Sequence, residues 1–362
     1  MAATPETGFL VLADLTGYTA YLAGSEIEHA PMIAGDLLET IVGRLDPPFR
    51  LAKFEGDAGF LFVEDGRAEG SLLLDAVEAS YLAFRRRLRS IDAATNCTCS
   101  SCRLAPRLDL KLFLHHGSYV HSRIAGRDEI AGSDVILVHR LLKGAVASEA
   151  RTAGFALLTT AAVESLGLDP TALGMTAASE SIEHLGHVST FVWDLEARWQ
   201  AESGQRRLDA ADGDIVLDVD ATLPGEASIV WAHLTTPALR SLWEGPMVVE
   251  EIPVAGRRGV GTVSQCVTGR LATLEEIVDW QPYDHIGWRL AVPVVGPVGA
   301  TVDLESVEDG TRVQLRWIRG GPGPADRDTF AAIASGKRAA LDRLATLLEA
   351  HDGAMPAQEA GT

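Results

Sequence analysis

One short stretch near the start of the chain restricts the fold more than any other. Residues 51–63 read LAKFEGDAGFLFV, two apolar runs separated by a polar centre that contains Gly56 and Asp57. A Gly followed by Asp between two β-rich runs is typical of a tight hairpin turn. A second apolar run, residues 8–13, is followed at once by Asp14. Two strands that each end in an aspartate can place both carboxylates at one edge of a sheet.

Asp14 and Asp57 are therefore candidate metal ligands. Hard divalent ions such as Mg²⁺ are held by one or two carboxylates together with phosphate oxygens. The alternative is that both are ordinary acids of turns, which favour Asp because its side chain bonds to nearby backbone.

The bulk composition narrows the class of protein. A chain of 362 residues favours two domains, and 47% hydrophobic residues suffice for real cores. The net charge of −19 argues against a nucleic-acid surface and against binding to anionic membranes. Neither an apolar run of about 18 residues nor a secretory leader pattern is found. We expect a cytoplasmic protein with no nucleic-acid or membrane partner.

The first 200 residues predict a mixed sheet covered by helices. Hydrophobic periodicity gives the order β-α-β-β-α-β-β-α-β. Besides the first strand and the hairpin, the expected strands are at 108–114, 119–124, 155–159 and 188–195, and the expected helices are at 18–45, 70–88, 133–147 and 161–166. The two strands at 108–114 and 119–124 are expected to form a pair around His115-His116-Gly117.

Four short motifs in this part make residues 8–166 resemble the class III nucleotide cyclase homology domain. They are DLTGYT (14–19), KFEGD (53–57), KLFLHHG (111–117) and GSDVILVHR (132–140), and they occur in the family's order. The resemblance implies an α+β domain with a ferredoxin-like mixed sheet. It also implies sites that are built across a homodimer.

The resemblance assigns roles to particular residues. Asp14 and Asp57, with the Leu15 carbonyl, would hold Mg²⁺ or Mn²⁺. Lys53 would recognise the base, with a second base-selecting residue near Glu129. Arg140 would stabilise the transition state. His139 is a further candidate, because its position beside Arg140 on the helix would make it face the nucleotide cleft.

One position departs from the family pattern. The asparagine that orients the ribose in cyclases is Ile136 here. An aliphatic side chain cannot orient a sugar, and loss of one positioning contact typically costs about 10²–10³ in rate. We expect a degenerate domain that binds metal and nucleotide or serves as a dimerising scaffold. An active cyclase that makes a cyclic nucleotide from ATP or GTP is the alternative.

A cysteine-rich segment lies before the third motif. Cys97, Cys99 and Cys102 form a Cys-x-Cys-x-x-Cys pattern that resembles an insert in a little-characterised bacterial subfamily of the cyclase-like fold. Three thiolates at this spacing can converge on one soft ion, most commonly Zn²⁺. Unliganded thiols or a redox pair are the alternatives. A fourth zinc ligand is expected from one of four histidines: His115, His116, His121 or His139.

The pattern changes after residue 200. Residues 1–200 are predicted as one domain, 201–212 as a linker, 213–351 as a second domain and 352–362 as a disordered tail. The second domain is expected to contain two short helices at 227–243 and a long one at 326–350, with strands at 215–223, 259–267, 270–280, 285–292, 300–307 and 312–318.

The second domain resembles the START-like polyketide cyclase and lipid-transport superfamily. The stretches that carry the resemblance are IVWAHLTTP (229–237) and EIVDWQP (276–282). It implies the helix-grip fold, an antiparallel sheet wrapped on the C-terminal helix around an apolar cavity. Tryptophans concentrate here, and four are candidate cavity walls, although each could instead pack in the core: Trp231, Trp243, Trp280 and Trp288.

The two resemblances together predict a regulatory or sensory protein. A small hydrophobic ligand would bind the second domain, and the cyclase-like domain would bind metal-nucleotide or dimerise. A START-like enzyme that acts on an aromatic substrate is a further alternative, although no acid/base pair for it is evident in the sequence.

Overall fold

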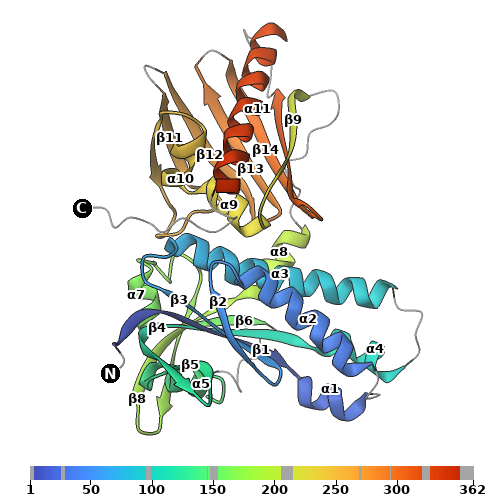
Figure 1. Cartoon of the computed structure of the whole chain (residues 1–362), viewed down its shortest axis with the longest axis vertical. Coiled ribbons are helices and arrows are strands. Elements are labelled where there is room, and N and C mark those ends of the chain that lie inside the picture. The colour runs from blue at the N-terminus through green and yellow to red at the C-terminus, as the bar shows by residue number, and fades with distance from the viewer. Residues whose placement is uncertain are drawn as a thin grey trace. The chain divides into compact units, whose positions relative to one another are not determined.

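The protein divides into two compact units, one reaching Ser203 and the other starting at Gly204. The computed structural model describes residues 4–25, 29–94, 99–144, 146, 154–204, 215–268, 271–293, 295–319 and 327–350. Each unit has its own sheet and its own buried apolar residues (Figure 1). The predicted tail, and the predicted linker from residue 205, lie outside the described residues.

The first unit contains an eight-stranded mixed sheet. Its strand order is β2-β3-β1-β4-β6-β8-β7, with β5 paired to β4 off this path. β1 and β4 are antiparallel, whereas β4 and β6 are parallel. The strands are β1 (Glu6–Thr16), β2 (Arg50–Glu55), β3 (Ala58–Glu64), β4 (Asp109–Ile124), β5 (Arg127–Ala131), β6 (Phe155–Thr159), β7 (Thr176–Ile182) and β8 (Gly186–Asp194). The mixed sheet confirms the predicted α+β class.

Helices cover both faces of this sheet. Side chains alternate along β1, so Leu10 and Leu12 join a core with Val138 and Leu141. α2 and α3 lie side by side on the opposite face from α5 (Figure 1). The helices are α1 (Tyr18–Gly24), α2 (Ala30–Leu45), α3 (Gly70–Ala94), α4 (Ser100–Leu104), α5 (Ser133–Leu141), α7 (Thr160–Ser165) and α8 (Leu195–Gly204), with a 3₁₀ turn at Ala105–Arg107.

The predicted strand pair around His115-His116-Gly117 is wrong. β4 runs through these residues without a turn, because β1 pairs with it along its whole length from Asp109 to Tyr119. Gly117 lets the Asp134 side chain of α5 approach this strand closely, since a Cβ there would lie 2.6 Å from the Asp134 carboxyl carbon.

Other boundaries also differ from the prediction. The helix expected at 18–45 is two helices, and the helix expected at 133–147 ends at Leu141. β5 and β7 were not predicted, because both are short and mostly polar.

The second unit is a seven-stranded antiparallel sheet with one long helix against it (Figure 1). The strand order is β10-β11-β12-β13-β14-β15-β9. The strands are β9 (Ile215–Leu223), β10 (Val248–Ile252), β11 (Val263–Thr268), β12 (Leu271–Gln281), β13 (His285–Val292), β14 (Gly296–Val307) and β15 (Gly310–Arg319). The helices are α9 (Ala227–Thr235), α10 (Pro237–Trp243) and α11 (Arg327–Ala350). This is the predicted helix-grip order, with β10 as the unpredicted strand.

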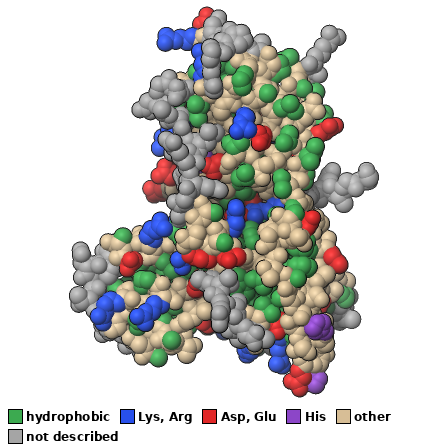
Figure 2. Space-filling model, turned by 180° about the vertical axis from the view of Figure 1, so that it is seen from behind, with side chains coloured by type: hydrophobic (Ala, Val, Ile, Leu, Met, Phe, Trp, Pro, Cys, Tyr) green, Lys and Arg blue, Asp and Glu red, His purple; other side chains and the backbone are tan. Residues whose placement is uncertain are grey.

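Two features of the described residues concern membranes and nucleic acids. None of the described helices is both long and apolar enough to span a bilayer. On the face shown in Figure 2, the described Lys and Arg side chains lie among acidic and hydrophobic ones and do not merge into one continuous basic area.

Candidate functional sites

The structure brings Asp14 and Asp57 to the same edge of the first sheet. Asp14 lies opposite Ala58 of β3, the residue that follows Asp57 in the hairpin turn. The backbone N–H of Leu15 donates to the Asp57 carbonyl at 3.2 Å, which ties this turn to the end of β1. On its other side Asp14 faces Lys111 of β4. The register of three strands therefore fixes this arrangement.

The charge balance at this edge disfavours ionisation of Asp14. Burial and, to a smaller extent, the Asp57 carboxylate raise the pKa of Asp14, the Lys111 ammonium lowers it, and the net result is a pKa of about 6. The carboxylates of Asp14 and Asp57 repel one another, and Lys111 offsets only part of this repulsion. A divalent cation bound between them would relieve the rest.

A second polar cluster joins β2, β5 and α5. The Lys53 ammonium lies 2.9 Å from a Glu129 carboxylate oxygen and 3.1 Å from one of Glu55. His139 Nε2 lies 2.7 Å from Glu55, and the imidazole packs edge-on against Phe60. The hydrogen bond that Lys53 donates to Glu129, together with the contact and charge of Glu55 and the charge of Glu129, raises the pKa of Lys53, against a smaller lowering by burial. The two residues that the cyclase resemblance assigns to base selection, Lys53 and Glu129, are thus in direct contact.

The exposed face of α5 carries the other residues of that motif. Ile136 is 55% exposed, and Arg140 is exposed one turn later on the same face. Arg140 makes no ion pair with any residue in the described ranges. Its guanidinium is therefore available to an external anion.

The histidines of β4 have structural partners. His115 is buried, its Nδ1 lies 2.8 Å from the Thr159 hydroxyl, and its Nε2 lies 3.4 Å from Asp134. Burial lowers the pKa of His115, against the opposing effect of Asp134. His116 faces the other side of the strand and lies 2.9 Å from Asp65.

The cysteine segment contains a partner that the sequence analysis missed. The potential ligand atoms of His29, Cys99 and Cys102 all lie within 4.8 Å of one another. His29 Nδ1 is 3.4 Å from Cys99 Sγ, and the backbone N–H of Cys102 donates to the same sulfur at 3.4 Å. The nearby histidine is therefore His29, just before α2, and none of the four histidines predicted as a fourth ligand. Cys97 lies outside the described residues.

His121 belongs to a different acidic group. Its imidazole lies with the carboxylates of Glu6 and Glu64, all three offering ligand atoms within 4.8 Å of one another. Glu64 already binds Arg50 and Arg67 at 3.0 Å, so this group is an exposed ion-pair network.

A cavity of about 610 Å³ lies in the second unit between the sheet, α10 and α11. Its walls are mainly apolar, and small residues of α11, Gly336, Ala339 and Ala340, also line it. Large apolar side chains on its walls include Trp243, Trp288, Leu290, Val302, Leu315 and Trp317.

Two of the four predicted wall tryptophans lie elsewhere. Trp243 and Trp288 line the cavity, but Trp231 and Trp280 do not. Trp231 is fully buried on α9 and packs edge-on against Trp280 at 4.8 Å and Tyr283 at 6.0 Å between ring centroids. Both side chains are core residues: Trp231 lies on α9, whose residues are all buried, and Trp280 of β12 packs against it.

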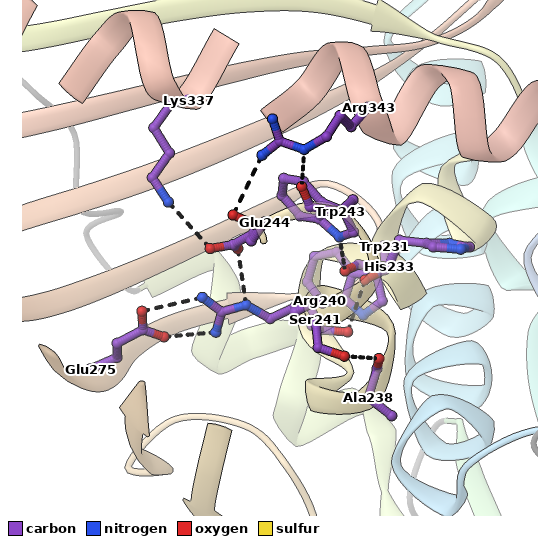
Figure 3. A network of polar contacts seen from close by, with 11 residues as sticks. Trp231, His233, Ala238, Arg240, Ser241, Trp243, Glu244, Glu275, Lys337 and Arg343 are labelled. Carbon is purple, nitrogen blue, oxygen red and sulfur yellow. Dashed lines mark hydrogen bonds and ion pairs between the residues drawn. The ribbon is translucent and has the colours of Figure 1, made fainter. Parts of the chain in front are cut away.

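Charged side chains form a chain of contacts inside the cavity (Figure 3). Arg240 binds Glu275 through two nitrogens at 2.7 and 3.2 Å, and its Nε donates to Glu244 at 3.1 Å. Lys337 of α11 lies 3.4 Å from the other Glu244 oxygen. Arg343 donates to the Trp243 carbonyl at 2.9 Å and so fastens α11 to the end of α10.

These contacts keep the network ionised. Burial alone would raise the pKa of Glu244, but Arg240 and Lys337 outweigh it and lower the pKa to about 2. Burial and the neighbouring Glu275 raise the pKa of the Cys266 thiol to about 12, so that thiol is neutral at physiological pH.

Two family matches cover most of the chain. Residues 34–150 match the family described as "Protein of unknown function (DUF2652)". Residues 214–349 match the family described as "Polyketide cyclase / dehydrase and lipid transport".

Comparison with solved structures found several to which parts of this chain are similar. The guanylyl cyclase Cya2 is 14% identical, with a TM-score of 0.41 over 53% of this chain and 94% of its own. The adenylyl cyclase CyaB from P. aeruginosa is 17% identical, with a TM-score of 0.39 over 57% and 98%. Protein CV1439 from Chromobacterium violaceum is 17% identical, with a TM-score of 0.31 over 38% and 98%.

A closer relative in sequence is an uncharacterized protein of Mycobacterium tuberculosis, 31% identical over 159 residues, which are 44% of this chain and 72% of that protein. By the extent of that match, the chain belongs to the same family as the mycobacterial protein, and its residues 214–349 form a domain of the polyketide cyclase/dehydrase and lipid transport family.

Proposed function

We propose that the protein is regulatory or sensory and that its second unit binds a small ligand with a largely apolar body. The observation that carries this proposal is the cavity of about 610 Å³ behind α11. Ligand sites typically measure about 300–1,000 Å³ and combine apolar walls with a few placed polar groups. A packed core, by contrast, holds few voids larger than a water molecule.

The chemistry of the cavity favours binding over catalysis. Its carboxylates are held by Arg240 and Lys337, and its thiol, Cys266, is protonated near neutral pH. General acid/base catalysis works best with a group whose pKa lies near the working pH. A START-like enzyme acting on an aromatic substrate is therefore the weaker alternative.

Filling the cavity tests this proposal. The full chain, purified gently, should release a small apolar molecule detectable by native mass spectrometry and solvent extraction. Ala340→Phe places a ring at a buried position on the cavity wall and should reduce bound ligand at least tenfold. Ala331→Phe is the matched control on an exposed position of the same helix. Equal ligand content in both variants would contradict the proposal.

We infer a second binding function, for a metal-nucleotide, at the edge of the first sheet. The paired carboxylates Asp14 and Asp57, the adjacent Lys53–Glu129 contact and the exposed Arg140 support it. Ile136 in place of the expected amide favours binding without efficient cyclisation. Mg²⁺ or Mn²⁺ would supply charge neutralisation for the triphosphate.

An assay with Mn²⁺ and ATP or GTP distinguishes binding from turnover. We expect Mn²⁺-dependent nucleotide binding that Asp57→Asn abolishes, with no steady cyclic product. Steady product that Asp57→Ala removes would instead show an active cyclase, and a homodimer would then be expected by sedimentation.

We also propose that His29, Cys99 and Cys102 bind a zinc ion. Ligand atoms around a tetrahedral zinc are roughly 3.5–4 Å apart, given a Zn–S bond of about 2.3 Å. The observed mutual spacing within 4.8 Å suits this geometry. Metal analysis should find zinc in the full chain and its loss in His29→Ala and Cys99→Ser, but not in Cys266→Ala. A disulfide between Cys99 and Cys102, without zinc, would favour a redox pair.

A further inference from the structure

The wall of the cavity carries more positive than negative charge. Three lining residues are cationic, Arg240, Lys337 and Arg343, and two are anionic, Glu244 and Glu275. Arg240 is held between the two carboxylates, by two bonds to Glu275 and one to Glu244. The lining therefore carries one more cation than anion, with Arg343 exposed and the Lys337 side chain 28% exposed beside the apolar walls.

The excess charge lies on α11. Lys337 contacts Glu244 at 3.4 Å, and this carboxylate already accepts a closer bond from Arg240 at 3.1 Å. An ammonium group has three donors, so the donors of Lys337 are not all used by this single contact. Arg343 donates to the backbone carbonyls of Trp243 and Glu244, and within the described residues it binds no carboxylate.

Apolar surface adjoins these cations. Trp243, Trp288 and Trp317 line the same cavity, together with the small residues of α11 that leave it open. A molecule in this space would therefore meet apolar walls over most of its surface and a cationic group where α11 contributes Lys337 and Arg343.

We propose that the ligand is an amphiphile with one anionic group, such as a carboxylate, which binds Lys337 while its apolar body lies against the cavity walls. This inference rests on the proposed ligand-binding function of the second unit. A charge-assisted hydrogen bond is shorter and stronger than a neutral one, and low local polarity strengthens it further. An anion here would balance the excess cation without disturbing the Arg240–Glu275 pair.

A matched pair of probes tests the charge requirement. Dansyl-undecanoic acid and its methyl ester share the apolar body and differ in charge. The full chain should bind the acid at least about tenfold more tightly than the ester, the ratio expected for one hydrogen bond to a charged group. Lys337→Gln should reduce the ratio to within about threefold, and Lys337→Arg should largely restore it.

Arg338→Gln provides the control. Arg338 is exposed, lies outside the cavity and is adjacent on the same helix, so this variant removes the same charge from the same region. It should keep the preference for the acid.

The outcomes separate the two proposals. Equal binding of acid and ester, or an unchanged ratio in Lys337→Gln, would overturn the anionic-ligand inference while ligand binding itself stands. Failure of both probes to bind, with no small molecule in the purified protein, would overturn the ligand-binding function and this inference with it.

Discussion

The two units treat buried acidic groups in opposite ways. At the sheet edge of the first unit, burial and a second carboxylate raise the pKa of Asp14 to about 6. In the cavity of the second unit, Arg240 and Lys337 overcome burial and lower the pKa of Glu244 to about 2. Both groups are partly buried, and the difference in pKa lies in their charged neighbours.

This difference indicates at which of the two sites the protein itself supplies enough positive charge for its carboxylates. The carboxylates of the cavity have their cations supplied by α10 and α11, so within the protein they already have partners of opposite charge. The carboxylates at the sheet edge repel one another, so they are best satisfied by a cation from solution. Groups held at an energetic cost are more often found at binding sites than in structural networks.

The largest expected effect comes from breaking the network of the second unit. Arg240→Met leaves Glu275 and Glu244 buried without their main partner and should reduce the free energy of unfolding by about 3–5 kcal/mol. Urea denaturation of the variant, with Arg338→Met as an exposed control, measures this loss. The double variant Arg240→Met/Glu275→Met should recover part of the lost free energy of unfolding, since Glu275 is then no longer a buried carboxylate without its cation. A loss below about 1 kcal/mol would show that the network contributes little.

Removing the charge of Asp14 in the first unit should stabilise the protein, whereas removing the charge of Arg240 should destabilise it. The pKa of Asp14 in the folded protein, about 6, exceeds the unfolded value of about 3.9. The folded state therefore binds more protons between these values, and stability falls as pH rises through this window. Asp14→Asn should raise the free energy of unfolding by about 1–2 kcal/mol at pH 7, discounted for partial exposure, and by almost nothing below pH 4.

Denaturation at pH 4 and pH 7 without divalent cations tests this sign. Destabilisation by Asp14→Asn at pH 7 would mean that the ionised carboxylate has a favourable partner within the protein. The proposed difference between Asp14, without enough positive charge nearby, and Glu244, with its cations supplied, would then be wrong.

The smallest effect is expected at the Lys53–Glu129 contact. The side chains are about one-third exposed, at 37% and 29%, so solvent screens the pair. Glu129→Gln should lower the pKa of Lys53 and change stability by less than about 1 kcal/mol. Its effect on nucleotide binding should be larger than its effect on stability. If the Lys53–Glu129 pair were purely structural, Glu129→Gln would change stability more than it changes nucleotide binding.

The sequence predicted best what depends on local pattern. Strand and hairpin periodicity was enough to place Asp14 and Asp57 at the ends of paired strands. The β9 strand and the α11 helix were predicted almost to the residue for the same reason.

What the sequence could not predict depends on distant packing. His29 lies 70 residues before Cys99, and no periodicity links the two. Trp231 and Trp243 both lie on short helices, yet only Trp243 lines the cavity, because α9 is enclosed by the core and α10 borders the open space. The charge network was equally hidden, since its members come from three elements that are far apart in the sequence, α10 with the residue after it, β12 and α11.

The most direct test of the contrast between the two units is one pH titration of the full chain, labelled with ¹³C at the Asp and Glu side-chain carboxyls. Asp14→Asn and Glu244→Gln would assign the two signals. We predict a pKa of about 6 for Asp14 and about 2 for Glu244, with added Mg²⁺ lowering the first and leaving the second unchanged. Ordinary values for both groups, or no response of Asp14 to Mg²⁺, would contradict this account.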